Sequence, residues 1–200
     1  MEAITPRDRE ILRNLAKEQL EAAHSPKNAA ILKKWQAQAE GRRESPTVRL
    51  LFSNFTHEVI TPRMRCSGES ARELEAALLS TMTGRTLFDD DTPISPTFDI
   101  RWDTWVKPFG LEPHLTRPQM ENPQGYHIDP VIEDLEGEID RLRGGSFGVD
   151  REKTRARAAL AQDTFGDILP VRMVMDSLTG PMTSPMVFLM GMENYYCSLY

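Results

Sequence analysis

The stretch Asp150–Tyr200 decides the fold, because it predicts a helix, a strand and a second helix in direct succession. VDREKTRARAALAQDTFGD (149–167) has a capping Asp near its start and a Gly near its end, as helices often have. ILPVRMVM (168–175) is short and apolar, which is typical of a strand with both faces covered. MVFLMGMENYYCSLY (186–200) predicts the last helix. The stretch therefore predicts one repeat of an α/β architecture and the start of the next.

Upstream of this repeat, two helices are predicted before any strand. Thr5-Pro6 starts the first helix, since Thr can cap and Pro fits the first turn, and the second helix covers about 28–39. The strand candidates are TVRLLF (47–52) and TFDI (97–100), and a third helix is expected between them at about 70–83. Strands that alternate with helices indicate a parallel sheet.

The least regular part of the sequence runs from Arg101 to Tyr126 and contains two Trp and four Pro. It predicts a long excursion with one extended piece near Trp105–Phe109. A helix is expected at Pro130–Arg143, where apolar residues recur at helical spacing. GGSFG (144–148) is interpreted as a flexible link rather than a phosphate cradle, because no strand leads into it.

Together these elements predict an α/β protein with about three parallel strands. No glycine fingerprint follows the first strand, which argues against a dinucleotide-binding fold. We therefore expect a partial TIM (β/α) barrel, with 1–45 as a two-helix N-terminal extension and 46–200 as the first part of the barrel. Because a complete barrel needs eight strands, the chain is expected to need a C-terminal half or a second copy as partner.

The composition excludes several classes of protein. A hydrophobic share of 40% and a charged share of 27% are those of an ordinary globular protein, and the net charge of −6 argues against a nucleic-acid partner. No apolar run reaches membrane-spanning length, and the charged N-terminus lacks the apolar core of an export signal. A cytoplasmic location is therefore expected, with Cys66 and Cys197 as free thiols. The acidic triplet Asp89–Asp91 is expected to be a solvated loop.

Three phrases of the sequence resemble the uroporphyrinogen-decarboxylase-like (URO-D) family of barrel enzymes: TPRDREILRNLAKEQLEAA (5–23), VDREKTRARAALAQDTFGDILPVRMV (149–174) and LMGMENYYCSLY (189–200). The similarity is closest to an anaerobe-associated branch with a two-helix N-terminal extension. The family includes porphyrinogen decarboxylases and cobalamin-dependent methyltransferases that act on methanol, methylamines or methoxylated aromatics. The resemblance implies a TIM barrel whose active site lies at the C-terminal ends of the strands. It also implies a corrinoid protein as partner and zinc as metal.

The loop SNFTHEVITPRMR (53–65) departs from the pattern of the family's decarboxylases. Their arginine-rich signature after the first strand is missing, and Arg63 and Arg65 lie too late to replace it. Because a decarboxylase must hold several substrate carboxylates with cations, this loss favours corrinoid-dependent methyl transfer. Uroporphyrinogen decarboxylation in tetrapyrrole biosynthesis and an inactive fragment are the alternatives. The zinc ligands of the family's methyltransferases come from the later half of the barrel, so no metal ligand is assigned here.

Side chains just past the strand ends of a barrel face its active site. The catalytic candidates on this basis are His57, Glu58, Asp99 and Asp176. The substrate-binding candidates are Asn54, Arg101, Trp102 and Trp105. A His beside a carboxylate can act as a base, and Arg101 can either orient Asp99 or bind a substrate carboxylate. The two tryptophans either stack on a flat ligand such as a corrin or pack the long loop onto the barrel.

Overall fold

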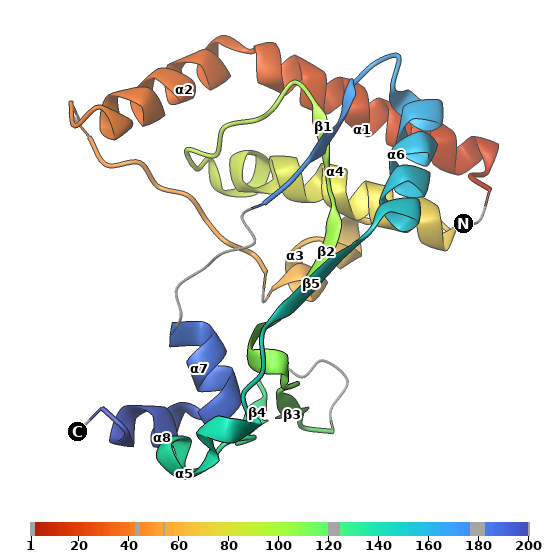
Figure 1. The fold of residues 1–200 in the computed structure, drawn as a ribbon. Coiled ribbons are helices and arrows are strands. Elements are labelled where there is room, and N and C mark those ends of the chain that lie inside the picture. Colours follow the sequence, from red (N-terminus) through yellow and green to blue (C-terminus); the bar gives the residue numbers. More distant parts are fainter. Residues whose placement is uncertain (1–2, 43–44, 54, 120–124, 177–182, 200) are drawn as a thin grey trace. The chain divides into compact units, whose positions relative to one another are not determined.

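The structure is a computed structural model, and it describes residues 3–42, 45–53, 55–119, 125–176 and 183–199 (Figure 1). Its elements group into two compact units. Unit 1 comprises Met1–Arg101 with Glu152–Val174, and unit 2 comprises Trp102–Arg151 with Met175–Tyr200. The expected boundary at residue 45 stays a prediction.

Unit 1 is largely helical. Its elements are α1 (Pro6–His24), α2 (Pro26–Ala39), α3 (Thr56–Val59), the 3₁₀ turn η1 (Thr61–Arg63), α4 (Glu69–Phe88) and α6 (Arg151–Phe165). Thr5 caps α1 by accepting a hydrogen bond from the N–H of Asp8 at 3.1 Å, as predicted. Ser25 caps α2 in the same way, with the N–H of Asn28 as donor at 3.2 Å. The local signal at Thr5 explains why the start of α1 could be predicted, whereas the second helix was expected from about 28 and begins at Pro26.

The sheet of unit 1 pairs β1 (Phe98–Arg101) with β6 (Val171–Val174) in parallel (Figure 1). Phe98 lies opposite Val171, and Asp99 lies opposite Arg172. β1 and β6 are the second and third predicted strands, so their parallel pairing is confirmed. Phe98 and Ile100 face the core, whereas Asp99 and Arg101 lie on the other face of the strand.

The predicted partial barrel is wrong. Among the described residues the strands form three separate two-stranded sheets, and two of these sheets are antiparallel. About three parallel strands were expected, but the parallel sheet contains only β1 and β6. The first predicted strand, 47–52, does not form a strand.

Hydrogen bonds to side chains explain why 47–52 does not enter a sheet. The N–H of Val48 donates to the carboxylate of Asp91 at 2.9 Å, and the N–H of Leu50 donates to that of Asp90 at 3.0 Å. The carbonyl of Val48 accepts from the N–H of Asp91 at 2.7 Å. Two carboxylates therefore satisfy the backbone groups that a neighbouring strand would otherwise satisfy.

Unit 2 is built from short elements. Two antiparallel pairs, β2 (Asp103–Lys107) with β5 (Ser146–Asp150) and β3 (His114–Thr116) with β4 (His127–Asp129), provide its strands. Its helical elements are η2 (Pro108–Gly110), α5 (Leu135–Glu138), η3 (Ile139–Arg141), α7 (Thr183–Met190) and α8 (Met192–Cys197). The extended piece expected near Trp105 corresponds to β2. The expected flexible link GGSFG is wrong, since three of its residues belong to β5.

The main hydrophobic core lies in unit 1. α1 packs on α4, and buried side chains from both helices meet others from α6 and β1. Phe98 of β1 and Phe165 of α6 are in edge-to-face contact, with ring centroids 5.1 Å apart. In unit 2 the buried apolar cluster consists of Ile132, Leu189 and Met190 among the residues that the structure describes.

Candidate functional site

A pocket of about 440 Å³ lies beside β1 in unit 1, and we call it the polar pocket. Its wall combines two arginines, one carboxylate and several hydroxyl groups, among them Arg49, Arg101, Asp99, Ser80, Thr92 and Thr97. These groups come from the extended segment 47–52, from α4, from the loop before β1 and from β1 itself. The pocket is therefore lined by side chains that can hold a small polar or anionic molecule.

Asp99 is fixed by hydrogen bonds on both of its carboxylate oxygens. Arg172 donates to it from Nη2 at 2.7 Å and from Nε at 3.0 Å, and the hydroxyl of Thr97 donates to it at 2.8 Å. The hydrogen bond from Arg172 lowers the pKa of Asp99, and burial opposes this only in part. Asp99 therefore stays ionised at neutral pH, which suits a positioning role better than proton transfer.

The two arginines of the polar pocket differ in their surroundings. Arg101 ends β1, and its charge contributes to lowering the pKa of Asp99. Arg49 is exposed and makes no hydrogen bond or ion pair with another residue in the described part of the chain. The guanidinium of Arg49 can therefore bind an anionic ligand without first giving up a protein partner.

Gln19 adds a buried polar group to the same wall. It is only 1% exposed, and its Nε2 donates to the carbonyls of Ser95 at 3.0 Å and Thr97 at 3.2 Å. Its Oε1 has no hydrogen-bond partner within the described ranges. Sequence reasoning missed both Gln19 and Arg49. A signal for Gln19 was available, because it continues the apolar stripe of Leu12 and Leu15 at helical spacing.

The other predicted site residues lie elsewhere. His57 and Glu58 are exposed on α3 and do not line the polar pocket, while Asn54 lies outside the described residues. Asp176, Trp102 and Trp105 belong to unit 2. The guanidinium of Arg151 lies 5.8 Å from the ring of Trp102, and the ring of Trp105 lies against Gly148 of the neighbouring strand. Asp99 and Arg101 are thus the predicted pair that the polar pocket brings together.

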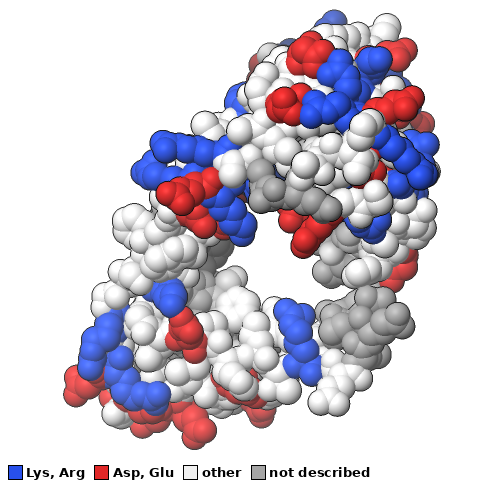
Figure 2. All heavy atoms as spheres, turned by 90° about the vertical axis from the view of Figure 1, so that its right-hand side faces the viewer, with Lys and Arg blue, Asp and Glu red and all other residues white. Residues whose placement is uncertain are grey.

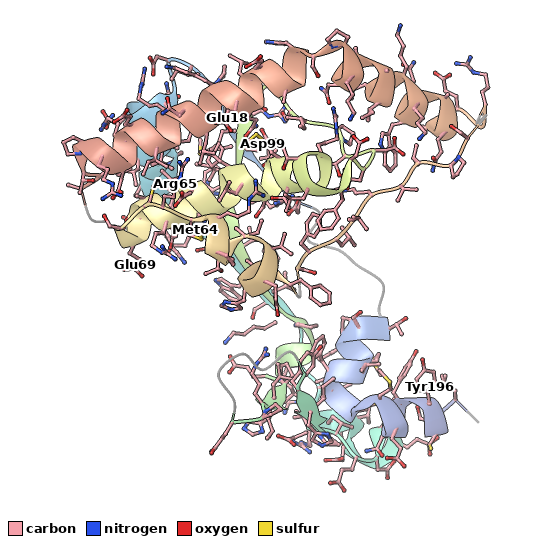
Figure 3. All side chains as sticks on the ribbon, turned by 180° about the vertical axis from the view of Figure 1, so that it is seen from behind. Glu18, Met64, Arg65, Glu69, Asp99 and Tyr196 are labelled. Carbon is pink, nitrogen blue, oxygen red and sulfur yellow. The ribbon has the colours of Figure 1, made fainter. Side chains whose placement is uncertain are left out.

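The arginines considered for decarboxylation do not meet at the polar pocket. Arg63 donates from Nη1 to the hydroxyl of Thr83 at 3.1 Å, and the N–H of Arg65 donates to Glu75 at 2.7 Å. Figure 3 labels Arg65 on the segment before α4 and Asp99 on β1. Of the three arginines Arg63, Arg65 and Arg101, Arg101 alone lines the polar pocket.

The thiol and carboxylates near the start of α4 have structural roles. Glu75 accepts hydrogen bonds from the N–H groups of Arg65 and Cys66, and Asp8 accepts from those of Ser67 and Gly68. Burial raises the pKa of the Cys66 thiol to about 12, and the carboxylate of Glu75 adds to the rise. Cys66 is therefore not a thiolate nucleophile at neutral pH.

The acidic triplet also differs from expectation. Asp89 is exposed, but Asp90 is buried and, with Asp91, holds the segment 47–52. In the described part of the chain, no group of three His, Cys, Asp or Glu side chains is arranged to hold a metal ion. The zinc implied by the family resemblance stays a prediction, and no step is assigned to it.

The surface charges and the hydropathy of the helices are relevant to nucleic-acid and membrane partners. Figure 2 shows acidic and basic side chains intermixed over the visible face, without a large basic area that would favour nucleic acid. Within the described ranges, no helix combines the length and the hydropathy needed to span a bilayer.

Comparison with protein-family models, with curated proteins and with solved structures finds no match to this chain. The family resemblance therefore rests on its sequence phrases.

Proposed function

We propose that the chain is part of a cytoplasmic enzyme that resembles the URO-D family and works in corrinoid-dependent methyl transfer. The quoted phrases support the family, and the polar pocket supports a substrate-binding role for unit 1. The observation that carries the proposal is that Arg49 and Arg101 line one pocket together with Asp99 and several hydroxyl groups.

The side chains of the polar pocket have different roles in this proposal. Arg49 and Arg101 bind a carboxylate or another oxygen of the substrate, because a guanidinium presents several N–H donors to such groups. Arg172 and Thr97 keep Asp99 ionised. The negative charge of Asp99 then orients the polar groups of the pocket wall. A corrinoid protein, when bound as partner, would supply the methyl acceptor or donor of the reaction.

Decarboxylation of a porphyrin precursor is the second candidate. The pair Arg49 and Arg101 favours it, since such a substrate carries several carboxylates. The positions of Arg63 and Arg65 do not, because neither lines the polar pocket.

An incomplete enzyme is the third candidate. In the described part of the chain, the sheet of β1 and β6 has no further strand on either edge. Parallel sheets are normally larger and covered on both faces, so these edges favour a requirement for a C-terminal half or a second copy.

A methyl-transfer assay with the protein tests the proposal. A methylated corrinoid has a different absorption spectrum from the demethylated form, so the assay follows the spectrum while methyl donors are supplied in turn. We expect turnover with at least one donor. Turnover of uroporphyrinogen, with none for any methyl donor or for methylcobalamin, would reverse the ranking of the two activities.

Variants connect this assay to the polar pocket. Arg49→Ala is expected to raise KM about tenfold, because it removes a charged hydrogen-bond donor to the substrate. Arg7→Ala is the matched control, since Arg7 is an exposed arginine of the same unit that does not line the pocket. Equal kinetics for Arg49→Ala and the unsubstituted protein would remove the polar pocket from the proposal.

A further inference from the structure

A second pocket, of about 890 Å³, lies within unit 2 and is lined by aromatic rings and methionine side chains. We call it the aromatic pocket. Tyr126 directly precedes β4, Phe188 comes from α7, and Met192 and Tyr196 come from α8, where Figure 3 labels Tyr196. Aromatic faces and polarisable sulfur atoms are the groups that best contact a flat ring.

The rings of the aromatic pocket are arranged to receive such a ligand. Tyr126 and Phe188 are nearly parallel, with an angle of 12° between their planes and 6.4 Å between their centroids. The guanidinium of Arg117 lies 5.4 Å from the centroid of Tyr126. One ring of this wall is thus already in cation–π contact, while Phe188 and Tyr196 make no such contact among the described residues.

The charge in the wall of the aromatic pocket is negative. Glu193 lines the pocket, is exposed, and has no hydrogen bond or ion pair with another described residue. His127, also in the wall, has its Nε2 3.6 Å from the carboxylate of Asp129. Asp129 also accepts a hydrogen bond from Thr116 at 2.8 Å, so it is anchored on the hairpin of β3 and β4. The carboxylate of Glu193 is therefore the group with which a cationic ligand can pair.

We propose that the aromatic pocket binds a small aromatic cation, an arylalkylamine. Its ring packs against Phe188 and Tyr196, and its ammonium group pairs with the carboxylate of Glu193. An anionic ligand of the same shape is repelled by Glu193. This inference concerns unit 2 and does not rest on the proposed methyl transfer.

Two soluble ligands of matched shape and opposite charge test the proposal. Phenethylamine and phenylacetate are titrated separately into the intact chain at pH 8, and binding is followed by NMR. At this pH an alkylammonium keeps its proton. We expect phenethylamine to bind and phenylacetate to bind at least fivefold more weakly.

Variants assign the effect to the pocket. Glu193→Gln keeps the shape of the side chain and is expected to weaken phenethylamine binding about three- to fivefold, as for an exposed ion pair. Glu136→Gln is the control, because Glu136 is an exposed glutamate of unit 2 outside the pocket, and it should leave binding unchanged. Phe188→Leu should weaken both ligands.

Three outcomes would overturn the inference. They are the absence of phenethylamine binding, equal binding of the two ligands, and a preference for the amine that Glu193→Gln leaves intact. Both glutamates are exposed, so neither substitution should impair folding, and a circular dichroism spectrum identical to that of the unsubstituted chain verifies this for each variant.

Discussion

Unit 1 and unit 2 are stabilised by different interactions. In unit 1, side chains from α1, α4, α6 and β1 share one buried core. In unit 2, the described buried cluster consists of Ile132, Leu189 and Met190, while Trp105 and Phe147 on the paired strands β2 and β5 remain exposed. Burial of apolar surface thus stabilises unit 1, whereas unit 2 depends more on local strand pairing.

The two units also differ in how deeply their polar groups are buried. Asp8 and Glu75 of unit 1 are buried, and each accepts hydrogen bonds from two backbone N–H groups. The His114–Asp129 pair of unit 2 is on the surface. Loss of a buried acceptor leaves its donors without a partner, whereas loss of an exposed pair leaves them to water. Substitutions should therefore have larger effects in unit 1.

The largest difference is expected between two phenylalanines. Phe165 in unit 1 is 0% exposed and Phe147 in unit 2 is 72% exposed. Phe165→Ala should reduce the free energy of unfolding by about 3–5 kcal/mol because it leaves a cavity, and Phe147→Ala by less than about 0.5 kcal/mol. Urea unfolding of both variants measures the difference. Equal losses would contradict the assignment of the main core to unit 1.

The next effect concerns the buried carboxylate of Asp8. Asp8→Ala should cost about 1–3 kcal/mol, because the N–H groups of Ser67 and Gly68 lose their acceptor inside the protein. Asp163→Ala is the control, since Asp163 is exposed and pairs with Arg9 at the surface. Thermal unfolding of the two variants compares them. A loss for Asp163→Ala as large as that for Asp8→Ala would show that burial is not the cause.

Acid should destabilise unit 1 by protonating carboxylates that accept hydrogen bonds. Burial would raise the pKa of Asp8, but hydrogen bonds from Ser67 and Gly68 outweigh it and lower the pKa below the ordinary 3.8. Hydrogen bonds from Arg172 and Lys34 lower the pKa values of Asp99 and Asp91. A carboxylate with a lowered folded-state pKa stabilises the protein above its unfolded-state pKa, and this is lost as pH falls through the folded-state pKa.

The free energy of unfolding should therefore be steady from pH 7 to about pH 5 and fall below about pH 4. Urea unfolding at a series of pH values measures this dependence. Hydrogen exchange of α1 and α4 amides at the same pH values assigns the change to unit 1. Protection of these helices that stays constant down to pH 2 would contradict the prediction.

The parts of the fold that the sequence predicts are those with local signals. Thr5 caps α1 by accepting from a backbone N–H three residues away, and α6 spans Arg151–Phe165, the bounds expected from Asp150 and Gly166. Asp99 and Arg101 could be singled out because both lie at the end of an apolar strand.

Long-range hydrogen bonds explain the failures. The apolar spacing of Pro130–Arg143 predicts one helix, yet the N–H groups of Val131 and Ile132 donate to the carbonyl of Leu189 at 2.7 and 3.1 Å. Helix therefore forms only in α5 and η3. Arg49 was missed for a similar reason, because carboxylates 40 or more residues further along the chain hold its segment beside the polar pocket.

In each unit, one glycine lies close to a neighbouring side chain. The third helix was expected at about 70–83, but α4 continues past Gly84, and a Cβ there would come within 2.8 Å of Cγ of Asp90. A Cβ on Gly148 would come within 2.7 Å of Nε1 of Trp105. Asp90 is buried and holds Leu50 and Thr92, whereas Trp105 is half exposed and can swing towards solvent.

Gly84→Ala should therefore destabilise the protein by about 1–2 kcal/mol, although the same change inside a helix normally stabilises by about 1 kcal/mol. Gly148→Ala should cost less than about 1 kcal/mol and shift the fluorescence of Trp105 to longer wavelength, because the ring becomes more exposed. Ala30→Gly on the exposed face of α2 is the control for helix propensity, with an expected cost of about 1 kcal/mol. Stabilisation by Gly84→Ala would mean that the carboxylate of Asp90 is free to move, and the contrast between a fixed unit 1 and an adaptable unit 2 would then fail at this position.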